Sequence, residues 1–194
     1  MTISKQIPNN KLQNTISDEE IIKMVVAGDE EKYGKIISRY EKRLKGFIKK
    51  LIGNNLEVDD IVEDSLILAY QNLRGFDAKQ QFSSWILRIA HNKTVDYIKK
   101  KKPKLVGDDE ITNYELRITN ENKSIIEELE IKDEDKKEIH NAINKLELKY
   151  KEVIILYFFE EKSYEEISDI LHTTVSNVGV MLNRAKTKLK QFLI

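Results

Sequence analysis

FSSWILRIAHNKTVDYIKKKK, residues 82–102, is the stretch that decides how this chain folds and what it presents to its surroundings. Its apolar residues recur at i, i+3, i+4 and i+7, the spacing of one buried helix face: Phe82, Trp85, Ile86 and Ile89. Its polar residues gather on the opposite side: Arg88, His91, Asn92 and Lys99. Four consecutive lysines end the segment. The pattern predicts a helix that packs on the protein by one face and turns a basic face toward a polyanion.

Composition favours an all-α protein made of two small helical modules. The chain has 194 residues, of which 40% are hydrophobic and 34% charged, and its two prolines and seven glycines are too few for a turn-rich β fold. The absence of cysteine excludes disulfides and thiolate metal sites and fits a reducing compartment. Apolar runs such as 153–159 are too short to cross a bilayer, and the N-terminus lacks a signal-peptide core. We therefore expect a cytoplasmic protein without direct membrane insertion.

The formal net charge of zero conceals a strong segregation of charge. Residues 88–104 carry seven basic side chains and one acidic, whereas residues 107–138 carry twelve acidic and five basic. After Asp169 no acidic residue follows, and the formal charges are all positive. Two basic modules joined by an acidic linker suggest two contacts with one polyanion.

The segment before Pro103 is expected to form a four-helix module spanning residues 17–103. A polar tail, 1–16, precedes it, and a polar loop, 74–81, separates its last two helices. Capping residues and apolar periodicity place the four helices. The first begins at residue 17 and stops at Gly28, and the others span 29 to about 52, 58 to 73, and 82 to 102. Proline ends the module, since it seldom continues a helix.

Residues 104–134 are expected to form a flexible acidic linker with at most one short helix near 124–131. The second module, 135–194, begins with apolar-periodic segments at 139–146 and 150–159. A short helix, a tight turn and a long basic helix then follow, at 164–171, 172–174 and 175–192. This order is the layout of a helix-turn-helix.

The last helix has one apolar seam and one polar face. The seam repeats at i, i+4, i+7 and i+11: Val178, Leu182, Ala185 and Leu189. Roughly opposite lie Ser176, Val180, Asn183, Arg184 and Thr187. A helix fits the DNA major groove, where Asn and Arg read base edges and Lys contacts phosphates. The alternative from charge alone is an amphipathic helix whose lysines are only solvated.

Two separate motifs resemble bacterial RNA polymerase sigma factors of the extracytoplasmic-function (ECF) group of the sigma-70 family. DDIVEDSLILAYQNLRGFD (59–77) with FSSWILRIAHNKTVDYIKK (82–100) is similar to region 2 of that group. LELKYKEVIILYFFEEKSYEEISDIL (146–171) with VSNVGVMLNRAKTKL (175–189) is similar to region 4. The resemblance covers about 18–102 and 135–192, in the order that the family has.

The resemblance implies a two-site clamp on a promoter, with no cofactor. The helix that docks on the β′ clamp helices of core RNA polymerase would present Asp60, Ile61, Glu63, Asp64 and Leu66. The minus-ten element would be contacted by Phe76, Asp77, Lys79, Arg88, His91, Asn92, Lys99 and Lys100. The minus-thirty-five element would be contacted by Thr174, Ser176, Asn177, Val180, Asn183, Arg184 and Lys186. Further implied partners are the β flap of polymerase and an anti-sigma factor.

Three departures from the family pattern bear on promoter recognition. Arg88 and Ile89 stand where primary sigma factors carry a pair of tryptophans, which implies weaker intrinsic melting. His172 holds a turn position that is often Gly, and Gly179 a position that is often basic. Gly179 costs about 1 kcal/mol of helix propensity relative to Ala, and its presence indicates either a close backbone approach or simple sequence drift. These positions leave the usual minus-thirty-five contacts open.

Several single residues have a structural interpretation beside the functional one. Trp85 and the aromatic run 157–159 are expected in the core, and His91 is expected to contact DNA or solvent. Asp60, Glu63 and Asp64 share a helix face, but nothing complements them as a two-metal nuclease site. No enzyme is therefore expected. The competing function is a stand-alone helix-turn-helix regulator that binds duplex operators without polymerase.

Overall fold

The computed structural model describes residues 16–101 and 133–193. Within these two ranges every regular element is a helix, as the composition predicts. Residues 1–15 of the expected polar tail and 104–132 of the expected linker, including its short helix, lie outside the described residues, while 133 and 134 already belong to a helix. No helix in the described part is both long enough and apolar enough to cross a membrane.

The first module consists of four helices and two short 3₁₀ turns: α1 (Asp18–Val26), η1 (Glu30–Lys32), α2 (Tyr33–Ile52), α3 (Val58–Gln71), η2 (Leu73–Gly75) and α4 (Phe82–Lys101). Ser17 begins α1 with a capping box, because its hydroxyl accepts from the Glu20 backbone while the Glu20 carboxylate accepts from the Ser17 N–H. α2 begins later than the expected residue 29, since the η1 turn follows Asp29.

An aromatic cluster joins α4 to the rest of the first module. The Phe82 ring is fully buried and lies 5.3 Å from Tyr40, 5.5 Å from Phe76 and 5.5 Å from Trp85, measured between centroids. Trp85 is 9% exposed, so the expectation that it packs in the core is confirmed. The helices α3 and α4 also pack on each other and on α2. The apolar stripe of α4 thus fixes which side of the helix remains outward.

The second module consists of α5 (Asp133–Asn144), α6 (Leu148–Ile154), a π-helical turn η4 (Ile155–Phe159), α7 (Tyr164–Ile170) and α8 (Val175–Phe192). Ser163 begins α7 with a second capping box, to Glu166. Thr174 caps α8 by accepting from the Asn177 backbone N–H. The buried residues of α8 are Val178, Leu182 and Ala185, three of the four predicted seam positions.

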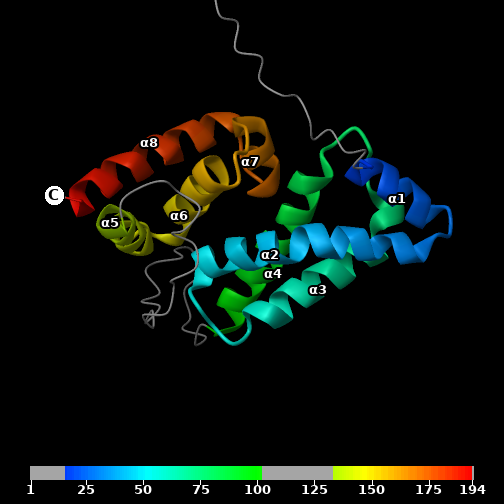
Figure 1. Ribbon diagram of the computed structural model, residues 1–194. Helices are drawn as coiled ribbons and strands as arrows, with labels where there is room; N and C mark the ends of the chain where they lie inside the picture. The colour runs from blue at the N-terminus through cyan, green and yellow to red at the C-terminus, as the bar shows by residue number, and fades with distance from the viewer. Residues whose placement is uncertain (1–15, 102–132, 194) are drawn as a thin grey trace, which may run out of the picture.

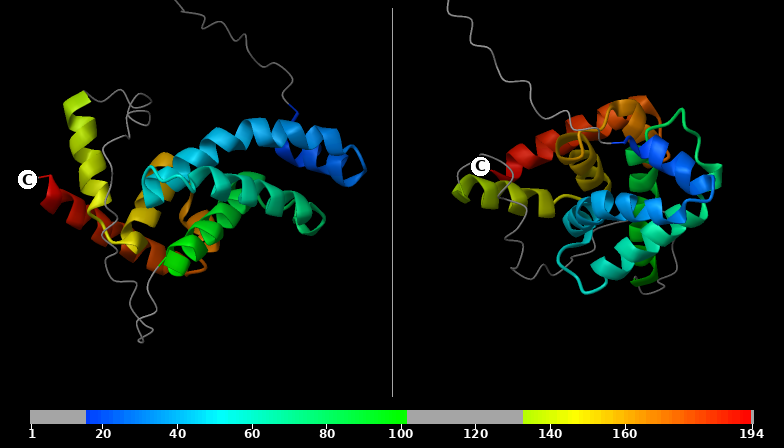
Figure 2. Two further views of the ribbon diagram at one scale, coloured as in Figure 1. Left: turned by 90° about the horizontal axis from the view of Figure 1, so that it is seen from below. Right: turned by 45° about the vertical axis from the view of Figure 1, so that its right-hand side comes forward.

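The two modules pack directly against each other. α7 lies on α4, and α6 contacts α2. In Figure 1 the second module occupies one end of the molecule, with α8 along its outer edge, while α1 lies at the opposite end. Figure 2 shows α6 beside the end of α2 from two further directions. Buried apolar residues of both modules form one continuous cluster.

Candidate nucleic-acid interface

The polar face of α4 is only partly open. Arg88 is half-buried, while Asn92, Lys99 and Lys100 are exposed, as the amphipathic pattern predicts. Lys101, in the last turn, donates to Glu57 at 2.5 Å and lies over the Tyr97 ring. At the C-terminal end of the helix Lys99 and Lys100 are therefore the exposed positive charges, and such lysines suit the backbone of a nucleic acid.

His91 is not on an open surface, contrary to the sequence prediction. It is 7% exposed, and its Nε2 lies 2.9 Å from Oε1 of Glu152 in α6. Helical periodicity places His91 correctly on the side of α4 away from the Phe82 stripe. The second module covers that side, so the side chain is an inter-module contact in this arrangement.

The loop before α4 also contains both exposed and partly buried side chains. Asp77 and Lys79 are exposed, and the Asp77 carboxylate accepts from the Lys79 backbone N–H at 3.0 Å. Phe76 is half-buried, and its ring lies 5.3 Å from that of Trp85 as well as near Phe82. Part of the Phe76 ring thus completes the aromatic cluster, and its expected contact with DNA stays a prediction.

A cleft of ≈250 Å³ runs between this loop and α7. The first module lines it with the 79–81 loop, Ser84, Trp85 and Arg88, and the second module with Glu166, Asp169 and Ile170. Lys79 and Arg88 on the wall from the first module thus face Glu166 and Asp169 on the wall from the second. Such a cleft is shaped by both modules together, so it exists only while they are packed.

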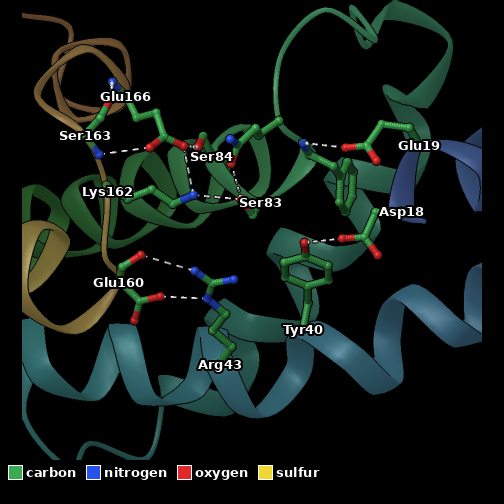
Figure 3. A network of polar contacts seen from close by, with 12 residues as sticks. Asp18, Glu19, Tyr40, Arg43, Ser83, Ser84, Glu160, Lys162, Ser163 and Glu166 are labelled. Carbon is green, nitrogen blue, oxygen red and sulfur yellow. Dashed lines mark hydrogen bonds and ion pairs between the residues drawn. The ribbon is translucent and has the colours of Figure 1, made fainter. Parts of the chain in front are cut away.

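A network of polar contacts joins the modules beside the cleft, as Figure 3 shows. Arg43 of α2 donates through Nε to Glu160 Oε2 at 2.7 Å. Lys162, 5% exposed, donates to Ser83 at 2.7 Å and to Glu166 at 3.0 Å. Ser84 also donates to Glu166. The network holds the start of α4 against the segment that leads into α7.

Glu166 is held in its charged form by this network. Burial raises the pKa of its carboxyl, but hydrogen bonds from Ser84, the Ser163 backbone and Lys162 together outweigh burial and bring the pKa below its ordinary value. Sequence reasoning missed this residue as a contact. Only its capping-box position after Ser163 was readable, because no local pattern links residues 82 positions apart.

On α3 the acidic side chains are exposed, and the apolar side chains among the predicted contacts are buried. Asp60, Glu63 and Asp64 are exposed, and Asp64 accepts from Lys93 of α4 at 3.2 Å. Ile61 and Leu66 are each 7% exposed and belong to the core. They anchor α3, because they lie on its inward side, and their expected contact with polymerase stays a prediction.

The outward face of α8 carries most of the side chains predicted there: Ser176, Asn177, Val180, Asn183 and Arg184 are all exposed. Three of the predicted contacts also have local roles, and one of them is Asn177, whose Nδ2 donates to the Thr173 hydroxyl at 2.8 Å. Thr174 is the helix cap, and Lys186 lies over the rings of Tyr157 and Phe158, at 5.7 and 5.4 Å from their centroids. Phe158 is 51% exposed, which corrects the expectation that the whole aromatic run is core.

The two unusual residues of the helix-turn-helix are explained differently. His172 has φ of 50°, in the left-handed region, which is why Gly often suits this turn. A Cβ at Gly179 would meet only the Tyr164 ring, at 3.6 Å, an ordinary contact. The close backbone approach that the sequence hinted at is therefore absent here.

A metal site is not apparent in the described part of the chain, where no three His, Cys, Asp or Glu side chains are grouped to hold an ion. The acidic residues of α3 point outward instead of converging, and two of them pair with lysines: Asp59 with Lys45 at 2.5 Å, and Asp64 with Lys93. This geometry suits a charged protein surface better than a two-metal nuclease site.

Comparisons with known proteins match both modules. Residues 36–103 match the family model of Sigma-70 region 2, and residues 136–189 that of Sigma-70, region 4. The ECF RNA polymerase sigma factor SigW of Bacillus subtilis (strain 168) is 33% identical over 89% of this chain and 94% of its own length. The ECF RNA polymerase sigma-E factor of Haemophilus influenzae is 25% identical over 90% of this chain and 94% of its own.

Two solved structures share the fold. One is CnrH in complex with the cytosolic domain of CnrY, with 22% identity and a TM-score of 0.65 over 91% of this chain and 96% of that one. The other is the sigma factor RpoE from Bartonella quintana in complex with the anti-sigma factor NepR. It has 17% identity and a TM-score of 0.61 over 84% of this chain and 97% of that one.

Proposed function

The chain belongs to the ECF RNA polymerase sigma factors, and from that premise we propose which of its surfaces meet polymerase and promoter. As a member of this family it binds core RNA polymerase and promoter DNA and directs transcription initiation. It is a transcription initiation factor, and we propose that it has no catalytic activity of its own. A stand-alone operator-binding regulator is not favoured, because both sigma regions match in order.

The acidic face of α3 is the proposed docking surface for the β′ clamp helices. Asp60, Glu63 and Asp64 support this, since they are exposed on one helix. Ile67, 47% exposed on the same helix, adds an apolar contact to the charged rim. Interfaces of this composition combine a small apolar anchor with charges that guide association. A contact with the β flap is assigned to the second module on the family resemblance alone.

The minus-ten element is proposed to meet the loop residues Asp77 and Lys79 and the α4 residues Arg88, Asn92, Lys99 and Lys100. The arrangement suits DNA strands that are being opened, because a helix and an adjoining loop can hold a strand whose bases have left the stack. The lysines would contact phosphates, so their contribution falls with rising salt. His91 joins this surface only if the second module moves away.

The minus-thirty-five element is proposed to meet the outward face of α8. One observation supports this most directly: a capped helix following a tight turn presents Ser176, Asn183 and Arg184 on its exposed face. Asn and Arg pair with base edges in the major groove, and Ser contacts phosphate or base. The domain boundaries proposed are 17–103 for region 2, 104–134 for the linker and 135–194 for region 4.

An anti-sigma factor is a proposed further partner. Both fold relatives named above were solved with a bound protein, CnrY in one case and the anti-sigma factor NepR in the other. We also assign the chain to the cytoplasm, where core polymerase is found.

Run-off transcription tests the proposed function. Purified core polymerase is incubated with sheared genomic fragments, with and without the full chain, and the transcript starts are mapped. The proposal predicts a small set of discrete starts that require the chain. Specific nanomolar binding of duplex operators by the chain alone, with no new starts, would favour the stand-alone regulator and overturn it.

A further inference from the structure

The C-terminal end of α4 is bound to the loop that joins α2 and α3. Lys101 donates through Nζ to Oε1 of Glu57 at 2.5 Å, and the same Nζ lies 4.9 Å from the centroid of the Tyr97 ring. The Tyr97 hydroxyl in turn accepts from Nδ2 of Asn55 at 2.6 Å. Residues 97 and 101 are spaced i, i+4, so the loop holds two successive positions on one row of α4.

The Glu57 side chain does not cap the helix that it precedes. Glu57 stands at the N-cap of α3, where a side chain commonly accepts from the backbone N–H groups of the first turn. It makes no such capping bond, and its carboxylate binds Lys101 of α4 instead. Helix capping therefore does not explain a carboxylate at this position. Its partner is a lysine 44 positions further along the chain.

Lys101 differs from the two lysines before it because its charge is paired. Lys99 and Lys100 are exposed. The Lys101 and Glu57 side chains are 48% and 35% exposed, so their ion pair also lies at the surface. The hydrogen bond from Lys101 lowers the pKa of the Glu57 carboxyl below its ordinary value, so both partners are charged at neutral pH. The positive charge at the end of α4 is therefore smaller than the lysine run alone suggests.

A carboxylate beside a lysine weakens the attraction of that lysine for DNA. Carboxylate and phosphate oxygens both accept from an ammonium group, so they compete for it. Contacts between lysine and phosphate add affinity for DNA of any sequence, and this part of the affinity falls with rising salt. Sequence is read by contacts to the bases instead. A paired lysine thus reduces the part of the binding that is independent of sequence.

We propose that Glu57 keeps Lys101 from promoter phosphates and so limits how strongly the end of α4 binds DNA of any sequence. Lys99 and Lys100 remain for the backbone contact. With that contact limited, promoter choice depends more on the side chains that we assign to the bases, such as Asn92. This inference rests on the proposed function of α4, and it gives a residue outside the DNA-contacting surface a part in promoter selection.

Three variants test the pair, and a fourth is the control. Glu57→Gln removes the charge and keeps the size of the side chain, Lys101→Gln removes the lysine, and the double variant removes both. Glu31→Gln makes the same charge change at an exposed position in η1. Tyr33, the residue after η1, contacts Tyr70 near the C-terminal end of α3, whereas Glu57 precedes its N-terminal end. The control therefore lies at the other end of the first module.

DNA affinity is measured with each full-length variant bound to core polymerase. The DNA is a labelled fragment that contains a start mapped by run-off transcription, and its anisotropy is followed at several NaCl concentrations between about 50 and 200 mM. In Glu57→Gln the slope of log affinity against log salt should steepen by about 0.7–0.9, the value of one additional phosphate contact. The affinity at about 0.1 M salt should rise about fivefold, the effect of such a slope over a tenfold change in salt.

Lys101→Gln alone and the double variant should keep the wild-type slope, because Lys101 makes no phosphate contact while Glu57 holds it. Glu31→Gln should keep it as well. The mapping of starts gives a second readout: Glu57→Gln should use additional starts, since stronger backbone contact tolerates poorer base contacts. All four variants should melt within about 3 °C of the wild-type chain, as expected for an exposed pair.

A wild-type slope in Glu57→Gln would overturn the inference. A steeper slope that persists in the double variant would do the same, because the gain would then not come from Lys101. Weaker DNA binding by Glu57→Gln would mean that the pair only braces α4. If the wild-type chain yields no transcripts with core polymerase, the proposed function fails and this inference fails with it. Transcripts together with unchanged slopes would refute this inference alone.

Discussion

The helices α4 and α8 have the same design but different surroundings. Each has an apolar seam on one side and a basic polar face on the other. The polar face of α8 is exposed from Ser176 to Arg184, whereas the second module covers the first half of the α4 face. Sequence periodicity reports which residues of a helix share a face. It does not report whether another module lies over that face, and here that difference decides what each helix can bind.

The seams also differ in size. α4 buries large side chains, among them Phe82, Trp85, Ile86 and Leu87, whereas α8 buries Val178, Leu182 and Ala185. The first module therefore holds α4 by extensive packing. α8 depends more on its cap and on the helices beneath it.

The largest expected effect concerns the buried seam of α4, with the exposed face of α8 as the comparison. Phe82→Ala should lower the free energy of unfolding by about 3–5 kcal/mol, because the ring is fully buried among three other aromatic rings. Val180→Ala on the exposed face of α8 should change it by less than about 0.5 kcal/mol. Urea denaturation followed by circular dichroism measures both. Equal losses would contradict the contrast.

The second prediction concerns the scaffold under α8, where Lys151 is 5% exposed. Burial lowers the pKa of this amine to about 8 from 10.5. The unfolded chain then binds more protons between these two values, so stability should rise as pH increases through this window. Below pH 8 the charged amine destabilises the fold.

Lys151→Met should therefore stabilise the protein at pH 7 by about 1–3 kcal/mol and lose this advantage near pH 10.5. Lys149→Met, on the exposed side of the same helix, is the control and should show no such pH dependence. Chemical denaturation at several pH values measures the difference. A Met variant no more stable than wild type at pH 7 would refute the cost assigned to the buried charge.

The third prediction tests the exposed face of α8 as a reader of DNA. Arg184→Ala should reduce transcription from promoters that depend on the minus-thirty-five element by about tenfold, the loss of one base or phosphate contact. The inter-module distance should stay unchanged, because the Arg184 side chain is exposed on α8. An unchanged promoter profile would show that this face is misassigned.

The smallest expected effect concerns an ion pair within the second module. Lys188 of α8 donates to Glu147 at 2.8 Å, and this contact lowers the pKa of the Glu147 carboxyl. Both side chains are partly exposed, so Glu147→Gln should lower the melting temperature by no more than about 3 °C. A larger drop, measured by calorimetry, would mean that α8 depends on this pair more than its seam suggests.

Local signals were sufficient for the helices and their ends. The turn at 172–174 and the apolar periodicity after it placed the start of α8, and the stripe of Phe82 and Trp85 gave the inward side of α4. These features depend on residues a few positions apart. The α8 boundaries agree with the predicted 175–192 for the same reason.

The errors share a different cause. His91 was expected outside because its own helix turns it away from the core, but the second module buries it. Arg43 and Glu160 meet across 117 positions, and no periodic pattern spans such a distance. Phe158 was expected inside on hydrophobicity alone, although it lies under Lys186 at the surface. Contacts between modules are set by the fold as a whole.

The central claim is that the two modules, which are packed together in the free chain, move apart when the chain binds polymerase and promoter. Energy transfer between dyes at Lys23→Cys and Lys190→Cys, recorded before and after addition of core polymerase, tests it most directly. The account predicts a short distance in the free chain and a clearly longer one in the complex. An inter-module distance that stays the same on binding core polymerase would contradict it.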